Sequence, residues 1–179
     1  NLEDNPIQYF LNWFADALTV NKDEANACVL STITPENTPC SRVVLLKEVN
    51  EKGFTFFTNY ISDKARNIEN NNNVSLNFYW PELERQVRIK GIAIKISIAA
   101  SDAYFKSRPR ASQLGAWVSE QSKAVALNHS FETTLSDLEK RFEGKEVERP
   151  IDWGGYCITP SCIEFWQGRP SRLHDRLVY

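Results

Sequence analysis

The chain has 179 residues, of which 42% are apolar and 25% are charged, and its formal net charge is −2. This length suffices for one domain with a buried core, and the near-neutral charge gives no general attraction to nucleic acid or to an anionic membrane surface. No apolar run approaches the roughly 20 residues that span a bilayer, and the acidic start of the chain is not typical of a signal peptide. We therefore expect a single domain over residues 1–179, located in the cytoplasm, with neither a membrane nor a nucleic acid as partner.

The four cysteines are Cys28, Cys40, Cys157 and Cys162; they form no Cys-x-x-Cys pair, and neither histidine has zinc-ligand spacing around it. Three of the four lie in apolar, strand-like stretches, where a free thiol behaves as a small apolar side chain. We expect a reducing compartment, free thiols and no metal site.

Helical and strand-like segments follow one another along the chain. A helix over residues 6–20 is predicted from its apolar spacing, with Asn5 as N-cap and Pro6 in the first turn. Further helices are expected at 62–70 and 101–108, with Ser62 and Ser101 as N-caps, and at 112–118 and 130–142. Strands are expected at 27–33, 42–49, 54–58, 74–79, 85–98, 156–167 and 172–179.

Short turns such as the one at residues 50–53 join neighbouring strands, which favours an antiparallel sheet or barrel with helices outside it. Regular βαβ alternation and a G-x-G-x-x-G motif are both absent from the sequence, which argues against a Rossmann domain. The predicted class is α+β, mainly antiparallel β, with peripheral helices.

The segment near the chain end concentrates cationic and titratable side chains. Arg172, His174 and Arg176 recur at period two, so they would share one face of an extended strand. Because like charges side by side repel, an anion between them is one explanation of the arrangement. The alternative is a polar hairpin face with ion pairs to Asp175 or Glu164.

Two further segments could bind anions. Arg42 and Lys47 bracket an apolar strand at an odd spacing, which a β-bulge or two different ligands would reconcile. Thr58, Ser62 and Lys64 lie where a strand runs into a helix N-terminus, which is a natural phosphate site. The alternatives are ordinary cations at a strand end and simple capping by Ser62.

A second phosphate site is indicated by Tyr104 and Arg108, which share a helix face, and by Ser112 after the proline break. The alternative is an ordinary surface helix end. Amides and hydroxyls around residues 117–122, together with Gln86, could read the edge of a heteroaromatic ring. Together these groups suggest binding of two phosphorylated aromatic rings, with a flavin supplying redox chemistry that side chains perform poorly.

The same segments resemble the pyridoxine/pyridoxamine 5′-phosphate oxidase family. The matching pieces run in family order over nearly the whole chain, and the last two are highly specific together. They are residues 42–47, 83–87, 107–119, 121–122, Trp153-Gly154-Gly155 and 163–176.

The resemblance implies an FMN-binding split β-barrel that acts as a homodimer with FMN at the interface. The cofactor contacts that we expect are Arg42, Val43, Val44, Leu45, Leu46, Lys47, Phe57, Thr58, Ser62, Lys64, Gln86, Gln121, Ser122, Trp166 and Arg176. The resemblance assigns the substrate phosphate to Lys47, Tyr104, Arg108 and Ser112. Arg172 and His174 would lie over the substrate ring at the flavin, Arg172 orienting the substrate and His174 holding a ring oxygen or tuning the local charge.

The sequence departs from the family pattern at three places. Asp63 stands where an arginine usually precedes the phosphate-binding lysine, and its carboxylate would repel a phosphate dianion. Phe57 stands where a tyrosine is common, so one hydroxyl is lost. The chain ends at Tyr179, whereas family members continue to another strand.

The predicted activity is the FMN-dependent oxidation of pyridoxamine or pyridoxine 5′-phosphate to pyridoxal 5′-phosphate. Oxygen would be the acceptor, giving H₂O₂, and NH₃ would leave from the amine. One alternative is a flavin or pyridoxal phosphate binder without catalysis. Another is a related FMN oxidase that acts on an unphosphorylated ring, as in phenazine assembly.

Overall fold

A computed structural model describes residues 4–118 and 130–179 of the chain. Its α-helices are α1 (Pro6–Val20), α2 (Asp63–Asn70), α3 (Ile98–Ser107), α4 (Arg110–Val118) and α5 (Phe131–Arg141). Its strands are β1 (Ala27–Ile33), β2 (Pro39–Asn50), β3 (Gly53–Asn59), β4 (Asn73–Trp80), β5 (Arg85–Lys95), β6 (Trp153–Gln167) and β7 (Asp175–Val178). Short 3-10 turns lie at η1 (Pro81–Leu83) and η2 (Pro170–Arg172).

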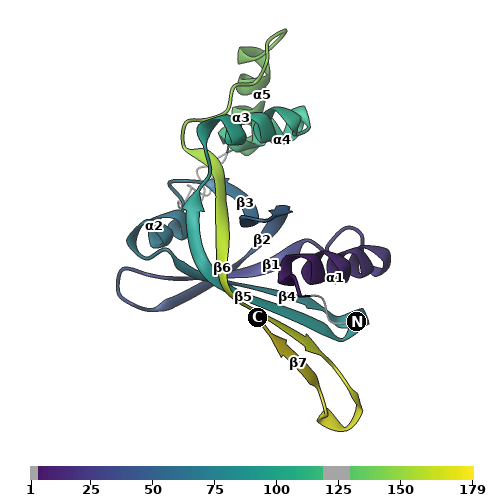
Figure 1. The fold of residues 1–179 in the computed structure, drawn as a ribbon. Helices are drawn as coiled ribbons and strands as arrows, with labels where there is room; N and C mark the ends of the chain where they lie inside the picture. Colours follow the sequence, from purple (N-terminus) through teal and green to yellow (C-terminus); the bar gives the residue numbers. More distant parts are fainter. Residues whose placement is uncertain (1–3, 119–129) are drawn as a thin grey trace. The chain divides into compact units, whose positions relative to one another are not determined.

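The strands form a closed antiparallel barrel (Figure 1). Their order is β3-β2-β1-β4-β5-β6-β7, and β3 also pairs with β6, so six strands close on themselves. Strand β7 pairs only with β6 and extends the sheet as the second arm of a hairpin. This confirms the predicted class of antiparallel β with peripheral helices.

The chain divides into two compact units, and the barrel strands β3 and β6 continue from one to the other. The first unit consists of Asn1–Phe56, Asn67–Ile94 and Tyr156–Tyr179, and the second of Phe57–Arg66 and Lys95–Gly155. That the chain behaves as one domain stays a prediction.

In the first unit, helix α1 packs its apolar face on the barrel, as its sequence spacing predicts. Asn5 caps the helix by accepting the N–H of Ile7 at 2.9 Å, and Phe10 is fully buried. The Phe10 ring meets Phe54 edge-on at a centroid distance of 4.9 Å and Phe78 at 5.1 Å. The helix is thereby packed on β3 and β4 through aromatic side chains.

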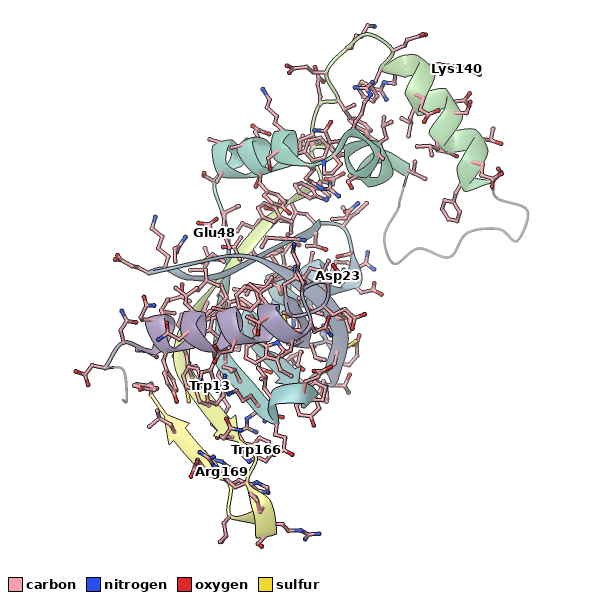
Figure 2. All side chains as sticks on the ribbon, turned by 90° about the vertical axis from the view of Figure 1, so that its right-hand side faces the viewer. Trp13, Asp23, Glu48, Lys140, Trp166 and Arg169 are labelled. Carbon is pink, nitrogen blue, oxygen red and sulfur yellow. The ribbon has the colours of Figure 1, made fainter. Side chains whose placement is uncertain are left out.

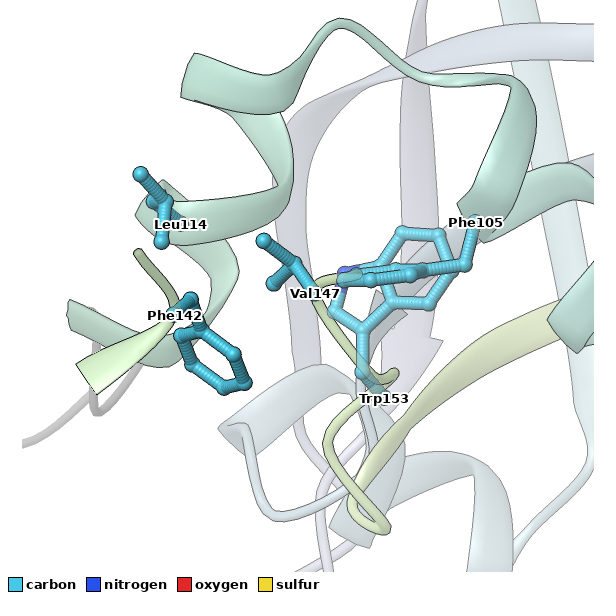
Figure 3. Packing of buried hydrophobic residues seen from close by; sticks show 5 residues of the cluster. All are labelled: Phe105, Leu114, Phe142, Val147 and Trp153. Carbon is cyan, nitrogen blue, oxygen red and sulfur yellow. The ribbon is translucent and has the colours of Figure 1, made fainter. Parts of the chain in front are cut away.

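The second unit has its own apolar cluster around helices α3 and α4 (Figure 3). Its buried members are Phe105, Leu114, Phe142, Val147 and Trp153. Helix α5 lies within the predicted range 130–142 and contributes partly buried Leu135 and Leu138, and Ser130 is its N-cap.

Two boundary predictions are wrong at the start of α3. Strand β5 ends at Lys95 instead of Ile98, and α3 begins at Ile98 instead of Ser101. The physical reason is an earlier serine: Ser97 has an extended backbone, and its hydroxyl accepts the N–H of Ala100 at 3.1 Å. Ser101 lies inside the helix and is buried.

The prediction of one extended strand over residues 172–179 is also wrong. Strand β7 begins only at Asp175, which pairs with Gln167, so residues 168–174 form the hairpin connection. Ser171 and Arg172 have φ values of 59° and 62°, in the left-handed region that no strand contains. Arg172 and His174 therefore do not alternate with Arg176 on one strand face.

Strand β2 has a β-bulge at Lys47, after the regularly alternating residues Arg42 to Leu46. The pairing of β2 with β3 steps from Leu46↔Phe56 to Glu48↔Thr55, which leaves Lys47 as the extra residue. The bulge, one of the two explanations offered by the sequence, is thus present.

Two further features concern the helices and the cysteines. Within the described ranges, no helix is both long enough and apolar enough to cross a membrane. All four cysteines are free thiols, and burial raises the pKa of the Cys28 thiol to about 12.

Candidate functional site

Three polar side chains meet where β3 leads into helix α2, in the second unit. The Lys64 ammonium donates to the Thr58 hydroxyl at 3.2 Å and to the Ser62 hydroxyl at 3.3 Å. Thr58 and Ser62 are buried, and the Ser62 hydroxyl donates to the carbonyl of Asn59 at 2.7 Å. Thr58, Ser62 and Lys64 are therefore brought together at a helix N-terminus, where the Lys64 ammonium is a cationic donor suited to an oxyanion.

Asp63, the departure from the family pattern, has a cationic partner of its own. Its carboxylate forms an ion pair and hydrogen bond with the Arg66 guanidinium, one helical turn away. Both side chains are more than half exposed, so water also screens the negative charge. The repulsion of a phosphate expected from Asp63 is thereby reduced.

Three aromatic rings stack in the second unit. Phe57 lies parallel to Tyr104 at a centroid distance of 3.8 Å, and to Trp153 at 5.2 Å. The Tyr104 and Trp153 rings are inclined by only 2°. Burial raises the pKa of the Tyr104 phenol, opposed by the charge of Arg108, so the phenol remains a hydrogen-bond donor near neutral pH.

Arg108 follows helix α3 and lies against this stack. Its guanidinium carbon is 4.8 Å from the centroid of the Trp153 ring and 5.6 Å from that of Phe105. Its Nη1 atom is buried and has no hydrogen-bond partner among the residues that the structure describes. Burial lowers the pKa of Arg108, opposed by Tyr104, although an arginine stays protonated. A buried cationic donor without an acceptor is suited to an anionic ligand.

Ser112 lies in the first turn of helix α4, after the break at Pro109. Its N–H donates to the carbonyl of Pro109 at 2.9 Å. The predicted set of phenol, guanidinium and hydroxyl thus comes from the end of one helix and the start of the next within one compact unit.

The run from Arg42 to Lys47 in the first unit alternates between the two faces of β2. Val44 and Leu46 are buried in the core, so any ligand contact that they make goes through the backbone, whereas Val43 and Leu45 are exposed. Arg42 Nη1 donates to the carbonyls of Leu30 and Cys40 and to the Thr32 hydroxyl, at 3.2, 2.9 and 2.8 Å. The barrel backbone thereby holds one side of this guanidinium.

In the hairpin of β6 and β7, the rings of Trp166 and His174 are 4.6 Å apart between centroids. Figure 2 shows Trp166 and Arg169 on this hairpin. The Arg169 N–H donates to His174 Nδ1 at 3.1 Å, and its guanidinium pairs with Asp175 at 2.8 Å. An accepting Nδ1 requires that the proton of a neutral imidazole sits on Nε2.

Glu164 joins two arginines on the same unit. Its Oε2 accepts from Arg88 at 2.9 Å, and its Oε1 is 3.7 Å from Nε of Arg176. Ion pairs within the hairpin, the alternative explanation of the cationic segment, are thus present for Arg176 and for Arg169.

Of the three predicted cofactor contacts that remain, the structure describes one. Gln86 lies in β5 opposite Tyr79 and is half-buried. Gln121 and Ser122 fall outside the described residues.

The sequence analysis assigned no role to Trp153, although the Trp-Gly-Gly segment that contains it is one of the pieces that match the family.

The chain matches the model of a known protein family. The family model described as pyridoxamine 5′-phosphate oxidase matches residues 14–142. The chain belongs to this family. A second model of the same family, described as the pyridoxine 5′-phosphate oxidase C-terminal dimerisation region, matches residues 153–179.

Family members named pyridoxine/pyridoxamine 5′-phosphate oxidase resemble the chain over almost its whole length. The protein of Rubrobacter xylanophilus is 54% identical over 98% of this chain and 81% of its own. Those of Flavobacterium johnsoniae and a Cyanothece species are 52% and 51% identical over 100% and 99% of this chain, and 84% of their own.

Two solved structures share the fold of this chain. PhzG of Burkholderia lata, crystallised with tetrahydrophenazine-1-carboxylic acid, superposes with a TM-score of 0.93 at 27% identity, over 100% of this chain and 88% of its own. An FMN-binding protein of Nostoc punctiforme, related to pyridoxamine 5′-phosphate oxidase, superposes at 0.78 and 18% identity, over 99% and 92%. The second likeness concerns the fold alone.

Proposed function

We propose that the protein oxidises pyridoxamine 5′-phosphate and pyridoxine 5′-phosphate to pyridoxal 5′-phosphate, using FMN and O₂. The observation that carries the proposal is the near-complete alignment, at 54% and 52% identity, with relatives named for these substrates. The geometry supports the proposal, because both substrates carry a phosphate and Arg108, beside Tyr104, has a buried Nη1 donor that could bind it.

FMN fits the residues at the start of α2. A phosphate monoester needs a cation and hydrogen-bond donors, and the Lys64 ammonium and the Thr58 hydroxyl supply them in contact with each other. The Ser62 hydroxyl donates its proton to Asn59 and accepts from Lys64, so it would hold the ammonium in place. The other proposed cofactor contacts are Arg42 to Lys47, Phe57, Gln86, Gln121, Ser122, Trp166 and Arg176. When bound, FMN would supply the redox chemistry, accepting a hydride from the C4′ carbon and passing electrons to O₂.

The protein's own contribution is positioning and electrostatics. Tyr104, Arg108 and Ser112, with Lys47, would hold the substrate phosphate. Arg172 would orient the ring, and the Nε2 proton of His174 would be donated to a ring oxygen, since the Arg169 N–H occupies its Nδ1.

We also propose a homodimer. The match of residues 153–179 to a dimerisation region supports it. The outer face of the barrel adds a second argument, since Val43 and its strand partner Val29 are 65% and 37% exposed, and Leu45 is 46% exposed.

The likeness to PhzG favours one second candidate, oxidation of an unphosphorylated tricyclic ring. The carboxylate of such a substrate can also accept from Arg108 Nη1, so sequence similarity decides between the two candidates. The identity to PhzG is 27%, against 54% for the B6-named relative. The experiment that decides is oxygen uptake with pyridoxamine 5′-phosphate, pyridoxamine and a dihydrophenazine carboxylate in parallel, at saturating FMN. We expect turnover of the first alone. Binding without oxygen uptake would instead favour a non-catalytic binder.

A further inference from the structure

The segment Trp153-Gly154-Gly155 begins strand β6, and the proposed function assigns it no role. The Trp153 indole is 7% exposed and lies 5.2 Å from the Phe57 ring and 4.8 Å from the Arg108 guanidinium carbon. Trp153 also packs edge-on against Phe105 (Figure 3). Its carbonyl accepts from the Arg149 guanidinium, which also pairs with Asp102 at 2.6 Å. The backbone and the ring of Trp153 are therefore both held in place.

The two glycines allow this strand to approach the rings beside it. A Cβ atom on Gly154 would lie 2.3 Å from the Tyr60 phenol oxygen, and one on Gly155 would lie 3.0 Å from the Phe57 ring. The Tyr60 hydroxyl donates to the carbonyl of Gly155 at 3.0 Å, which fixes the separation. A larger residue at position 154 would clash with Tyr60, and one at position 155 would clash with Ile96 and with Phe57, which belongs to the stack.

The stack in turn limits where Arg108 and Tyr104 can point. A guanidinium prefers to lie flat over an indole, and a phenol stacked at 3.8 Å on Phe57 has little freedom to turn. The two groups therefore hold their directions before any ligand arrives. Such preorganisation raises affinity because less ordering remains for the ligand to impose.

We propose that Trp153 is a positioning residue for phosphate recognition, which aims the Arg108 guanidinium while the two glycines keep the ring within reach. This inference rests on the proposed function only in taking the anion at Arg108 to be the phosphate of a B6 vitamer. Trp153 itself need not touch the ligand.

The test is a double-mutant cycle measured by ligand binding in the FMN-loaded protein. Calorimetry gives the Kd of pyridoxal 5′-phosphate and of pyridoxal for the wild type, W153L, R108A and the double variant. We expect W153L to weaken pyridoxal 5′-phosphate binding by about 5- to 30-fold and pyridoxal binding by less than about twofold. The double variant should bind no more weakly than R108A, within about twofold.

Two further variants separate positioning from general damage to the core. F142L removes another buried ring of the same cluster, one that lies against Arg141 instead of Arg108, and should leave both Kd values unchanged. W153F keeps an aromatic ring that attracts a cation more weakly than indole does. It should lower the ratio of the pyridoxal Kd to the pyridoxal 5′-phosphate Kd by about 2- to 5-fold. This variant tests the inference if W153L does not fold.

Equal weakening of both ligands in W153L or W153F, or losses that add in the double variant, would overturn the inference. Because binding is measured without turnover, the outcome stands apart from that of the proposed function. A wild type that binds pyridoxal 5′-phosphate without oxidising pyridoxamine 5′-phosphate would contradict the activity alone.

Discussion

Among single side chains, Lys64 has the most specific predicted effect on the cofactor. Replacing it in K64M removes the cation while the Thr58 and Ser62 hydroxyls that it contacts remain. Since hydrogen bonds to charged groups contribute about 1.5–3 kcal/mol, FMN affinity should fall by about 10- to 100-fold. Quenching of FMN fluorescence on titration measures this.

The control for this change is the neighbouring D63N. Its carboxylate pairs with Arg66 in an exposed position, so its loss should change FMN affinity by less than about fivefold. If D63N improved binding as strongly as K64M weakened it, Asp63 would face the phosphate and our view of its ion pair would be wrong.

Arg108 should determine the preference for phosphorylated substrates. In R108A we expect KM for pyridoxamine 5′-phosphate to rise by about 100-fold, because a buried charged contact is lost, with little change for pyridoxamine. R108K keeps the charge without the planar fork and should lose about tenfold. Steady-state oxygen uptake gives both constants, and a loss in kcat with unchanged KM would contradict a binding role.

Among the secondary-structure elements, the closure of the barrel depends on Gly53 at the start of β3. Its φ is +138°, and a Cβ there would lie 2.0 Å from the carbonyl oxygen of Ile158 in β6. G53A should therefore cost about 3 kcal/mol or more and lower Tm by about 6–12 °C in thermal unfolding followed by circular dichroism.

G144A is the matched control, because Gly144 also has a positive φ, +67°, but nothing lies within 4 Å of its Cβ position. Only the backbone cost of about 1–2 kcal/mol should appear. Equal Tm changes in the two variants would show that close packing of β3 against β6 does not matter.

The elements also show what the sequence can and cannot determine. The α1 helix, its Asn5 cap and the β1 strand follow from local spacing and capping chemistry, and the structure agrees. The predicted strand over residues 172–179 starts too early, because Ser171 and Arg172 adopt positive φ values although neither is a glycine. Nothing in their local chemistry signals such a conformation, which the closure of the hairpin imposes.

Part of the candidate site was predictable from the sequence, because a strand–helix junction places Lys64 near Thr58. Tyr104 and Arg108 are neighbours as predicted, but the predicted shared helix face is wrong, since α3 ends at Ser107 and Arg108 has an extended backbone. The contacts missed were those between distant segments. Trp153 meets Arg108 across 45 residues and Glu164 meets Arg88 across 76, and pairing of this kind depends on the barrel. Local patterns carry no such information.

For the molecule as a whole, we expect a dimer by size-exclusion chromatography with light scattering. V43D places a carboxylate on the exposed apolar face of β2 and should shift the protein toward monomer, since an unpaired charge in an interface is costly. I151D changes an even more exposed apolar residue, in a loop, and should remain dimeric. A monomeric wild type would contradict the proposed assembly.

The most direct test of the proposed activity is the visible spectrum of the FMN-loaded protein when pyridoxamine 5′-phosphate is added without oxygen. The proposed function predicts that the yellow flavin absorbance is lost, that pyridoxal 5′-phosphate forms in equal amount, and that the absorbance returns when air is admitted. A flavin spectrum that stays unchanged, with pyridoxamine 5′-phosphate shown by calorimetry to be bound, would contradict the central claim.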